Sequence, residues 1–384
     1  MNLSAAVLSM PRSGIREIMD LAWATEGVIH LEVGEPDVPT PRHALEAAHR
    51  AALDGATRYT PNAGMPELRE ALAAKIARVN EIPTRADGVV VTAGGVQALY
   101  AALRVLLDPG DEILLPDPGW PNYRMMATLL GLDVATYELS ADADFRIDAE
   151  RLEAVCTDRT RAVMINSPSN PVGTVFQEEE LRAVLDVAKR RGLWLVSDEC
   201  YDQVVFEGRH RSLAALDSDD QVVTAFSFSK TYAMTGLRVG YLTGPSEFIK
   251  AAAKTQEPLV SCVNAPAQVA ALAALQGPQD VVDEMCTSYR GRRDEAVELL
   301  RGGGVDVYPP KGAFYLWIDV SLAGIPSQEF ARLLVQEHGV AVVPGGVFGE
   351  RGEGRVRVSL ATAREALLEG LSRLVALHEH LRIT

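Results

Sequence analysis

The chain has 384 residues, of which 47% are hydrophobic, and a formal net charge of −15 at pH 7. This length and hydrophobic content allow about two globular domains, each with its own core. The acidic balance argues against nucleic acid or an anionic membrane surface as a partner, because both attract clustered lysines and arginines.

Strand-like and helical segments alternate along the middle of the chain. The predicted strands cover 88–92, 111–115, 162–165, 193–196 and 222–226. The predicted helices cover about 96–107, a segment after Pro121, and 178–191. Such alternation is typical of the α/β class, with a mostly parallel sheet covered by helices on both faces.

The C-terminal part has a different pattern. A helical stretch from about Ala265 is interrupted at 276–278 and continues to Leu300; strand-like segments at 305–308, 313–317 and 354–359 and a closing helix follow. Strands followed by helices predict a smaller α+β domain. We expect glycines 302–304 to end a helix, His378 and His380 to lie on a solvated helix end, and Arg12 and Arg16 to lie on the surface.

Four cysteines are scattered without the paired spacing of a metal site: Cys156, Cys200, Cys262 and Cys286. We expect reduced thiols, no disulfide and no metal, as in a cytoplasmic enzyme. The apolar stretch 5–10 has no preceding basic residue and ends at Pro11, so it fits neither a signal peptide nor a membrane-spanning helix.

Polar residues follow three of the predicted strands. Asn170 follows 162–165, Asp198 and Tyr201 follow 193–196, and Lys230 follows 222–226. Because the carboxyl ends of parallel strands meet at one edge of a sheet, these side chains are expected to share one crevice. A lysine in a turn of small residues can condense with an aldehyde. Each motif alone has an ordinary alternative, namely a surface lysine, an Asn-Pro turn or a helix N-cap.

The ordered series of motifs resembles the class I/II family of pyridoxal-phosphate-dependent aminotransferases, which have fold type I. The resemblance extends over nearly the whole chain and rests on 34–37, 59–64, 92–95, 170–171, 198–201, 229–230 and 355–359. It implies a large cofactor-binding domain at 41–275, a small domain at 276–384 and an N-terminal segment at 1–40 that joins the small domain. It also implies a homodimer with shared active sites.

The resemblance gives the candidate catalytic residues their roles. Lys230 would condense with the cofactor aldehyde and then move the proton of the substrate Cα. Asp198 would keep the pyridine nitrogen protonated. Tyr201 and Asn170 would hydrogen-bond the phenolic oxygen O3′ of the cofactor.

The same resemblance implies a phosphate site at the start of a helix, formed by Gly94, Gly95, Val96, Ser227, Ser229 and Arg238. Trp120 would stack on the pyridine ring, with core packing as the alternative. Tyr59 matches the tyrosine that in this family reaches the phosphate of the neighbouring subunit.

The substrate α-carboxylate would be bound by Arg357, with Asn170 and the backbone of Gly34 beside it. Arg355 lies on the same face of the predicted strand, so spacing alone does not choose between the two arginines. The Arg-x-Ser pattern of the family favours Arg357.

The implied reaction is ping-pong transamination between an amino acid and a 2-oxo acid. Val96 stands where aspartate-using relatives often carry a lysine, and 261–264 lacks the arginine that some relatives supply from the partner subunit. We therefore expect a neutral or aromatic amino donor rather than aspartate, with glutamate and 2-oxoglutarate open as a partner pair.

Two other functions stay open on the sequence. A C–S lyase of the same fold would eliminate a β-substituent without a 2-oxo acid acceptor. A non-catalytic regulator that binds pyridoxal phosphate is the alternative from another class. Such regulators carry a DNA-binding domain ahead of the fold, and we expect none in the short stretch before Gly34.

Overall fold

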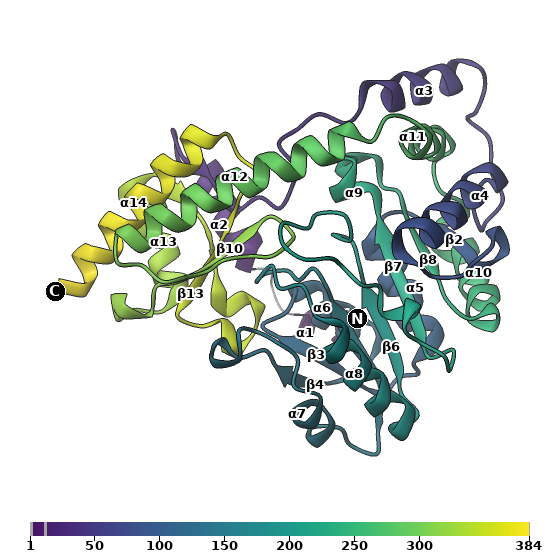
Figure 1. Cartoon of the computed structure of the whole chain (residues 1–384), viewed down its shortest axis with the longest axis horizontal. Helices are drawn as coiled ribbons and strands as arrows, with labels where there is room; N and C mark the ends of the chain where they lie inside the picture. Colours follow the sequence, from purple (N-terminus) through teal and green to yellow (C-terminus); the bar gives the residue numbers. More distant parts are fainter. Residues whose placement is uncertain (1–2, 11–13, 384) are drawn as a thin grey trace.

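The computed structural model describes residues 3–10 and 14–383, so Pro11 and Arg12 lie outside the described residues (Figure 1). Its largest sheet has seven strands. In spatial order these are β2 (Val89–Thr92), β8 (Gly240–Thr243), β7 (Val222–Ser227), β6 (Trp194–Asp198), β5 (Thr160–Asn166), β3 (Glu112–Asp117) and β4 (Asp133–Glu138). Only β8 runs antiparallel to its neighbours, which confirms the predicted mostly parallel sheet.

Helices cover both faces of this sheet. The side chains of its strands alternate between the two hydrophobic cores that form under these helices. In β5, Ala162 and Met164 pack on one face, and Val163 and Ile165 pack on the other. The first face is covered by α5 (Gly95–Leu106), α6 (Pro121–Leu130) and α10 (Ser246–Val260). The other helices of this part are α3 (Arg42–Leu53), α4 (Pro66–Lys75), α7 (Ala149–Ala154), α8 (Glu178–Arg191), α9 (Phe228–Thr231) and α11 (Ala265–Gln276).

Helix α8 has the range predicted for it, and its ends show the local signals that define it. The Glu180 side chain accepts the backbone N–H of Gln177 at 2.8 Å as part of a capping box. Acidic residues fill the first turn and basic residues the last, which complements the helix dipole. Gly192 ends the helix in the left-handed region, at a φ of 65°.

A second, antiparallel sheet has four strands, in the order β12 (Val343–Pro344), β13 (Arg355–Ser359), β10 (Tyr315–Asp319) and β9 (Val307–Tyr308). Beside it, β1 (Ile29–His30) pairs in parallel with β11 (Val340–Ala341), which brings the segment after residue 30 to this sheet. The long helix α12 leads from α11 toward the C-terminal helices (Figure 1). The remaining helices are α1 (Ala5–Ser9), α2 (Gly14–Trp23), α12 (Asp280–Gly302), α13 (Ser327–His338) and α14 (Arg364–Ile383).

Three local results differ from the sequence analysis or extend it. His378 is only 3% exposed, so the expectation of a solvated position is wrong for it: α14 packs against α12 and the segment 321–323. Strands β4 and β8 were not predicted; β4 is an edge strand with few buried side chains, and β8 is a buried strand that runs antiparallel to its neighbours. The expected end of α12 at the glycines is confirmed.

In the part of the chain that the structure describes, no helix has the length and apolar character needed to cross a bilayer.

Candidate active site

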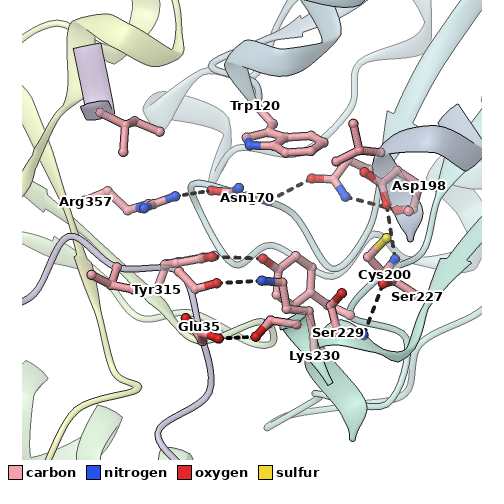
Figure 2. A pocket seen from close by; sticks show the side chains of 18 of the residues that line it. Glu35, Trp120, Asn170, Asp198, Cys200, Ser227, Ser229, Lys230, Tyr315 and Arg357 are labelled. Atoms are coloured by element: carbon pink, nitrogen blue, oxygen red, sulfur yellow. Dashed lines mark hydrogen bonds between the residues drawn. The ribbon is translucent and has the colours of Figure 1, made fainter. Parts of the chain in front are cut away.

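A cavity of about 340 Å³ lies between the carboxyl ends of β5, β6 and β7 and residues of the four-stranded sheet (Figure 2). Twelve of the predicted site residues line it: Gly34, Gly95, Val96, Trp120, Asn170, Asp198, Tyr201, Ser227, Ser229, Lys230, Arg238 and Arg357. We call Asp198, Tyr201, Ser227, Ser229 and Lys230 the cofactor wall, and Gly34, Tyr315 and Arg357 the carboxylate wall.

Lys230 lies on α9, immediately after β7. The Ser227 hydroxyl oxygen accepts the backbone N–H of Ser229 at 3.1 Å and so caps the turn from strand to helix. This turn brings Lys230 Nζ into the cavity, where it donates a hydrogen bond to the carbonyl oxygen of Gly34 at 2.5 Å (Figure 2). No carboxylate of the described residues pairs with Lys230, so its amine has no anionic competitor for a carbonyl ligand.

Asp198 ends β6 and is 4% exposed. Its Oδ2 accepts the hydroxyl of Tyr123 at 2.7 Å, and its Oδ1 accepts the backbone N–H of Cys200 at 3.2 Å. Burial raises the pKa of Asp198, and the hydrogen bonds from Tyr123 and Cys200 oppose that rise. A buried carboxylate of this kind favours a cationic N–H partner, such as a protonated ring nitrogen.

Tyr201 is 5% exposed and its hydroxyl lies 2.9 Å from the hydroxyl of Tyr315. Burial, and then the neighbouring Tyr315, raise the pKa of Tyr201 well above its usual value. Tyr201 is therefore a neutral hydroxyl that can donate one hydrogen bond.

Asn170 lies beside Arg357 of the carboxylate wall. Its Oδ1 accepts from Arg357 Nη1 at 2.9 Å, and its backbone N–H donates to Asn166 Oδ1 at 2.8 Å. The bond from Arg357 orients the side-chain amide of Asn170, and the bond to Asn166 holds its backbone.

Arg357 is a buried cation without an acidic partner among the described residues. It is 3% exposed, its guanidinium lies 4.2 Å from the ring centroid of Tyr315, and Nη2 donates to the backbone oxygen of Glu32 at 2.8 Å. Arg355 instead lies 2.9 Å from Asp319 Oδ2 and does not line the cavity. Of the two arginines that spacing left open, Arg357 is the one available to an anionic ligand.

The first residues of α5 line the end of the cavity that also contains Arg238. Gly94 has a φ of 84°, and a Cβ there would lie 2.2 Å from Arg238 Nη2, so glycine allows the guanidinium to approach the backbone. Arg238 Nη1 donates to the backbone oxygen of Thr235 at 2.7 Å and lies 3.5 Å from Ser229 Oγ. Arg238 has no acidic partner among the described residues, and the N-terminus of α5 adds backbone donors, as a phosphate requires.

These features fit pyridoxal phosphate. The cavity has a buried carboxylate for the ring nitrogen, a hydroxyl donor, a cationic end for the phosphate and a lysine that pairs with no carboxylate of the described residues. Trp120 lies over this space (Figure 2), with its ring 5.4 Å from Tyr123 and nearly perpendicular to it.

Two predicted residues do not line the cavity. Gly94 packs against Arg238, and the Arg238 side chain lines the cavity. Tyr59 is 88% exposed and lies in a separate hollow with Cys262 and Asn264. Tyr59 therefore does not reach the cavity of its own chain.

Sequence reasoning missed several lining residues: Ile15, Met19, Asn166, Tyr123, Cys200 and Tyr315. Asn166, Cys200 and Tyr123 lie inside or next to motifs that were recognised, so proximity to those motifs was an available signal. Tyr315, Ile15 and Met19 come from distant segments without a local signal.

The family model for aminotransferase class I and II matches residues 26–374. The aspartate aminotransferase of Pyrococcus horikoshii is 36% identical over 97% of this chain and 96% of that protein. The aromatic-amino-acid aminotransferase 2 of Thermococcus litoralis is 37% identical over 97% of each chain. The solved structure of the Thermus thermophilus aspartate aminotransferase with maleate superposes with a TM-score of 0.94, at 37% identity, over 98% of this chain and 100% of that one.

Matches of this extent and identity agree with the fold described above. The chain belongs to the aminotransferase class I and II family and is a pyridoxal-phosphate-dependent aminotransferase.

Proposed function

We propose that this aminotransferase works by a ping-pong mechanism and takes its nitrogen from a neutral or aromatic amino acid in preference to aspartate. Relatives named for aspartate and for aromatic amino acids match at nearly equal identity, so overall similarity does not choose between the two classes. The choice rests on the side chains of the cavity.

The observation that carries the proposal is the number of cations in the cavity. Among the described lining residues, only Lys230, Arg238 and Arg357 are positively charged, and each has an assigned partner in the cofactor or the substrate α-carboxylate. None is left for a second carboxylate. Val96, which is 40% exposed at the cavity, offers an apolar contact instead.

Each residue of the two walls has a distinct task. Pyridoxal phosphate, when bound, supplies an aldehyde that takes up the substrate nitrogen and a ring that accepts the electron pair released at Cα. With cofactor and substrate bound, Lys230 would accept and return the Cα proton, Asp198 would keep a proton on the ring nitrogen, and Arg357 would orient the α-carboxylate. Tyr201 would donate its hydroxyl proton to the phenolic oxygen.

The test is an absorption titration of the cofactor-loaded enzyme with single amino acids and no acceptor. Neutral or aromatic donors are expected to convert the cofactor spectrum at least about tenfold faster than aspartate, which corresponds to ~1.4 kcal/mol. Aspartate outperforming every neutral and aromatic donor would contradict the preference. Pyruvate and ammonia accumulating without acceptor would instead show the C–S lyase reaction.

We also propose a homodimer in which Tyr59 serves the site of the second copy. The support is the position of Tyr59, which is exposed and outside the cavity of its own chain. The four cysteines are all free thiols, which supports a cytoplasmic location.

A further inference from the structure

Two residues of the carboxylate wall contact the cofactor wall: Gly34 through its backbone carbonyl and Tyr315 through its side chain. Tyr315 lies on β10 and is 2% exposed. In the register of the sheet Tyr315 pairs with Ser359 and Trp317 pairs with Arg357, so Tyr315 and Arg357 are diagonal neighbours on the same face. The guanidinium of Arg357 therefore lies over the tyrosine ring, 4.2 Å from its centroid.

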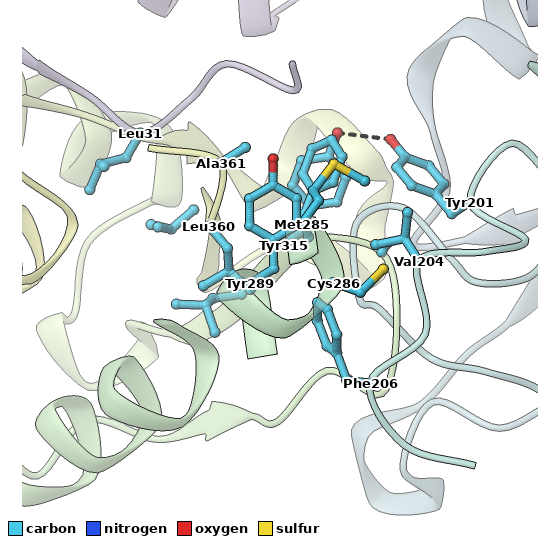
Figure 3. Close-up of a cluster of buried hydrophobic side chains, with 14 of the residues drawn as sticks. Leu31, Tyr201, Val204, Phe206, Met285, Cys286, Tyr289, Tyr315, Leu360 and Ala361 are labelled. Carbon is cyan, nitrogen blue, oxygen red and sulfur yellow. Dashed lines mark hydrogen bonds between the residues drawn. The ribbon is translucent and has the colours of Figure 1, made fainter. Parts of the chain in front are cut away.

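The hydroxyl of Tyr315 reaches the opposite wall. It forms a 2.9 Å hydrogen bond with the hydroxyl of Tyr201, at the meeting point of the two parts of the molecule (Figure 3). Tyr201 is its hydrogen-bond partner among the described residues. The two rings lie 6.0 Å apart in an edge-to-face arrangement.

The same hydroxyl limits the space at Gly34. A Cβ on Gly34 would lie 2.4 Å from the Tyr315 oxygen but 3.4 Å from the next ring atom, Cζ. Gly34 has an ordinary negative φ, so steric contact with Tyr315 and not backbone conformation requires glycine there. The carbonyl of Gly34 in turn accepts the hydrogen bond from Lys230.

A tyrosine hydroxyl has one proton to donate. If Tyr201 donated its proton to Tyr315, it would have none for a ligand oxygen. If Tyr315 is the donor, Tyr201 accepts that bond and keeps its own proton for the cavity. Neither hydroxyl has another acceptor among the described residues, so a ligand oxygen that accepts the proton of Tyr201 would select this second direction.

We propose that Tyr315 is a positioning residue that sets the spacing between the carboxylate wall and the cofactor wall and directs the hydroxyl proton of Tyr201 into the cavity. The inference rests on the proposed function of both walls. It separates two tasks of one side chain: the ring supports Arg357, and the hydroxyl orients Tyr201.

The first experiment needs neither cofactor nor turnover. Gly34→Ala, Tyr315→Phe and the double variant are compared with the wild type by thermal unfolding of the cofactor-free protein. Gly34→Ala is expected to lower the melting temperature when Tyr315 is present. In the Tyr315→Phe background the same change should have little effect, because the nearest ring atom then leaves an ordinary contact distance. An equal loss in both backgrounds would overturn the steric part of the proposal.

The second experiment separates KM from kcat for the best amino donor. Tyr315→Phe keeps the ring, so kcat should fall by about tenfold with little change in KM. Tyr315→Leu removes the ring as well, so KM should also rise by about tenfold. Tyr308→Phe, on the neighbouring strand β9 and outside the cavity, is the matched control and should leave both constants unchanged.

If the two Tyr315 variants change KM and kcat in the same proportion, the division into two tasks is wrong. If the wild-type enzyme converts no amino acid at all, the proposed function fails, and the unfolding experiment still decides whether Tyr315 sets the space at Gly34.

Discussion

The cofactor wall is assembled from residues that follow neighbouring parallel strands, whereas the carboxylate wall is assembled from three segments far apart in the chain. Asp198 and Lys230 each stand at or just after a strand end, so the sheet itself brings them together. Gly34, Tyr315 and Arg357 meet only because β1 joins β11 and because β10 pairs with β13. Local motifs thus encode one wall, and tertiary pairing creates the other.

The comparison also separates two kinds of chemistry. In the proposed function, every amino acid substrate uses the groups of the cofactor wall in the same way. The carboxylate wall would bind the α-carboxylate, and the edge of the cavity at Val96, which we call the rim, would contact the substrate side chain. Variants of the first wall should therefore affect all substrates equally, and variants near the rim should change the choice among them.

The largest effect is expected for Asp198→Asn. Loss of the buried carboxylate removes the electrostatic partner of the ring nitrogen, so kcat should fall by about 10²–10³-fold for every amino donor. The measurement is the acceptor-free half-reaction over a panel of donors. A loss confined to one donor class would contradict the assignment of Asp198 to the cofactor wall.

The same substitution should stabilise the cofactor-free protein. Burial raises the pKa of Asp198 above its usual value of 3.8, so the folded state binds this proton more tightly than the unfolded state does. The ionised Asp198 therefore costs stability as the pH rises through the raised pKa, and that cost is absent at lower pH. Asp198→Asn should increase the free energy of unfolding at pH 7 more than at pH 4, as measured by urea denaturation.

The next effect compares two arginines of one strand. Arg357→Lys should raise KM by about 10–100-fold, because lysine cannot reproduce a bidentate contact to a buried carboxylate. Arg355→Lys should change KM by less than about threefold, because Arg355 pairs with Asp319 outside the cavity. Steady-state kinetics of both variants tests this, and equal effects would show that the carboxylate is bound elsewhere.

The rim is tested by Val96→Lys. A cation at this position should raise kcat/KM for aspartate by about tenfold, or ~1.4 kcal/mol, and leave neutral donors nearly unchanged. Val155→Lys is the matched control, because Val155 is 39% exposed, close to the 40% of Val96, and lies outside the cavity. No gain with aspartate would mean that its second carboxylate does not approach Val96.

The smallest effect is expected for Tyr59→Phe, which should weaken cofactor binding by about fivefold through the loss of one hydrogen bond. Mixing this variant with Lys230→Ala should create dimers with one intact site. Activity at limiting cofactor should then rise above that of Tyr59→Phe alone. Mixing it with the Tyr59→Phe, Lys230→Ala double variant supplies the control and should give no rise. A site that uses its own Tyr59 would gain nothing from either mixture.

More of the cofactor wall than of the carboxylate wall could be predicted from the sequence. Asn170, Asp198 and Lys230 could be predicted because each follows a recognisable strand. Arg357 and Arg355 could not be separated by spacing, since the difference between them is the tertiary contact of Arg355 with Asp319. Tyr123 lies next to a recognised motif, but its hydrogen bond to Asp198 depends on how α6 packs against β6 and could not be predicted.

Tyr315 is the clearest example of a site residue that could not be predicted from the sequence. Its strand was predicted, but its two contacts depend on the register of β10 with β13 and on the meeting of the two sheets. Neither leaves a pattern in the residues around 315, because strand register is set by pairing partners elsewhere in the chain.

The most direct test of the account is to identify the lysine that binds the cofactor. The protein is loaded with pyridoxal phosphate, reduced with borohydride, digested and mapped by mass spectrometry. We predict a single stable cofactor adduct on Lys230, absent from Lys230→Ala and retained in Lys250→Ala, whose lysine lies exposed on α10 beside Glu247. An adduct on another lysine, or none under saturating cofactor, would contradict the placement of the active site in this cavity.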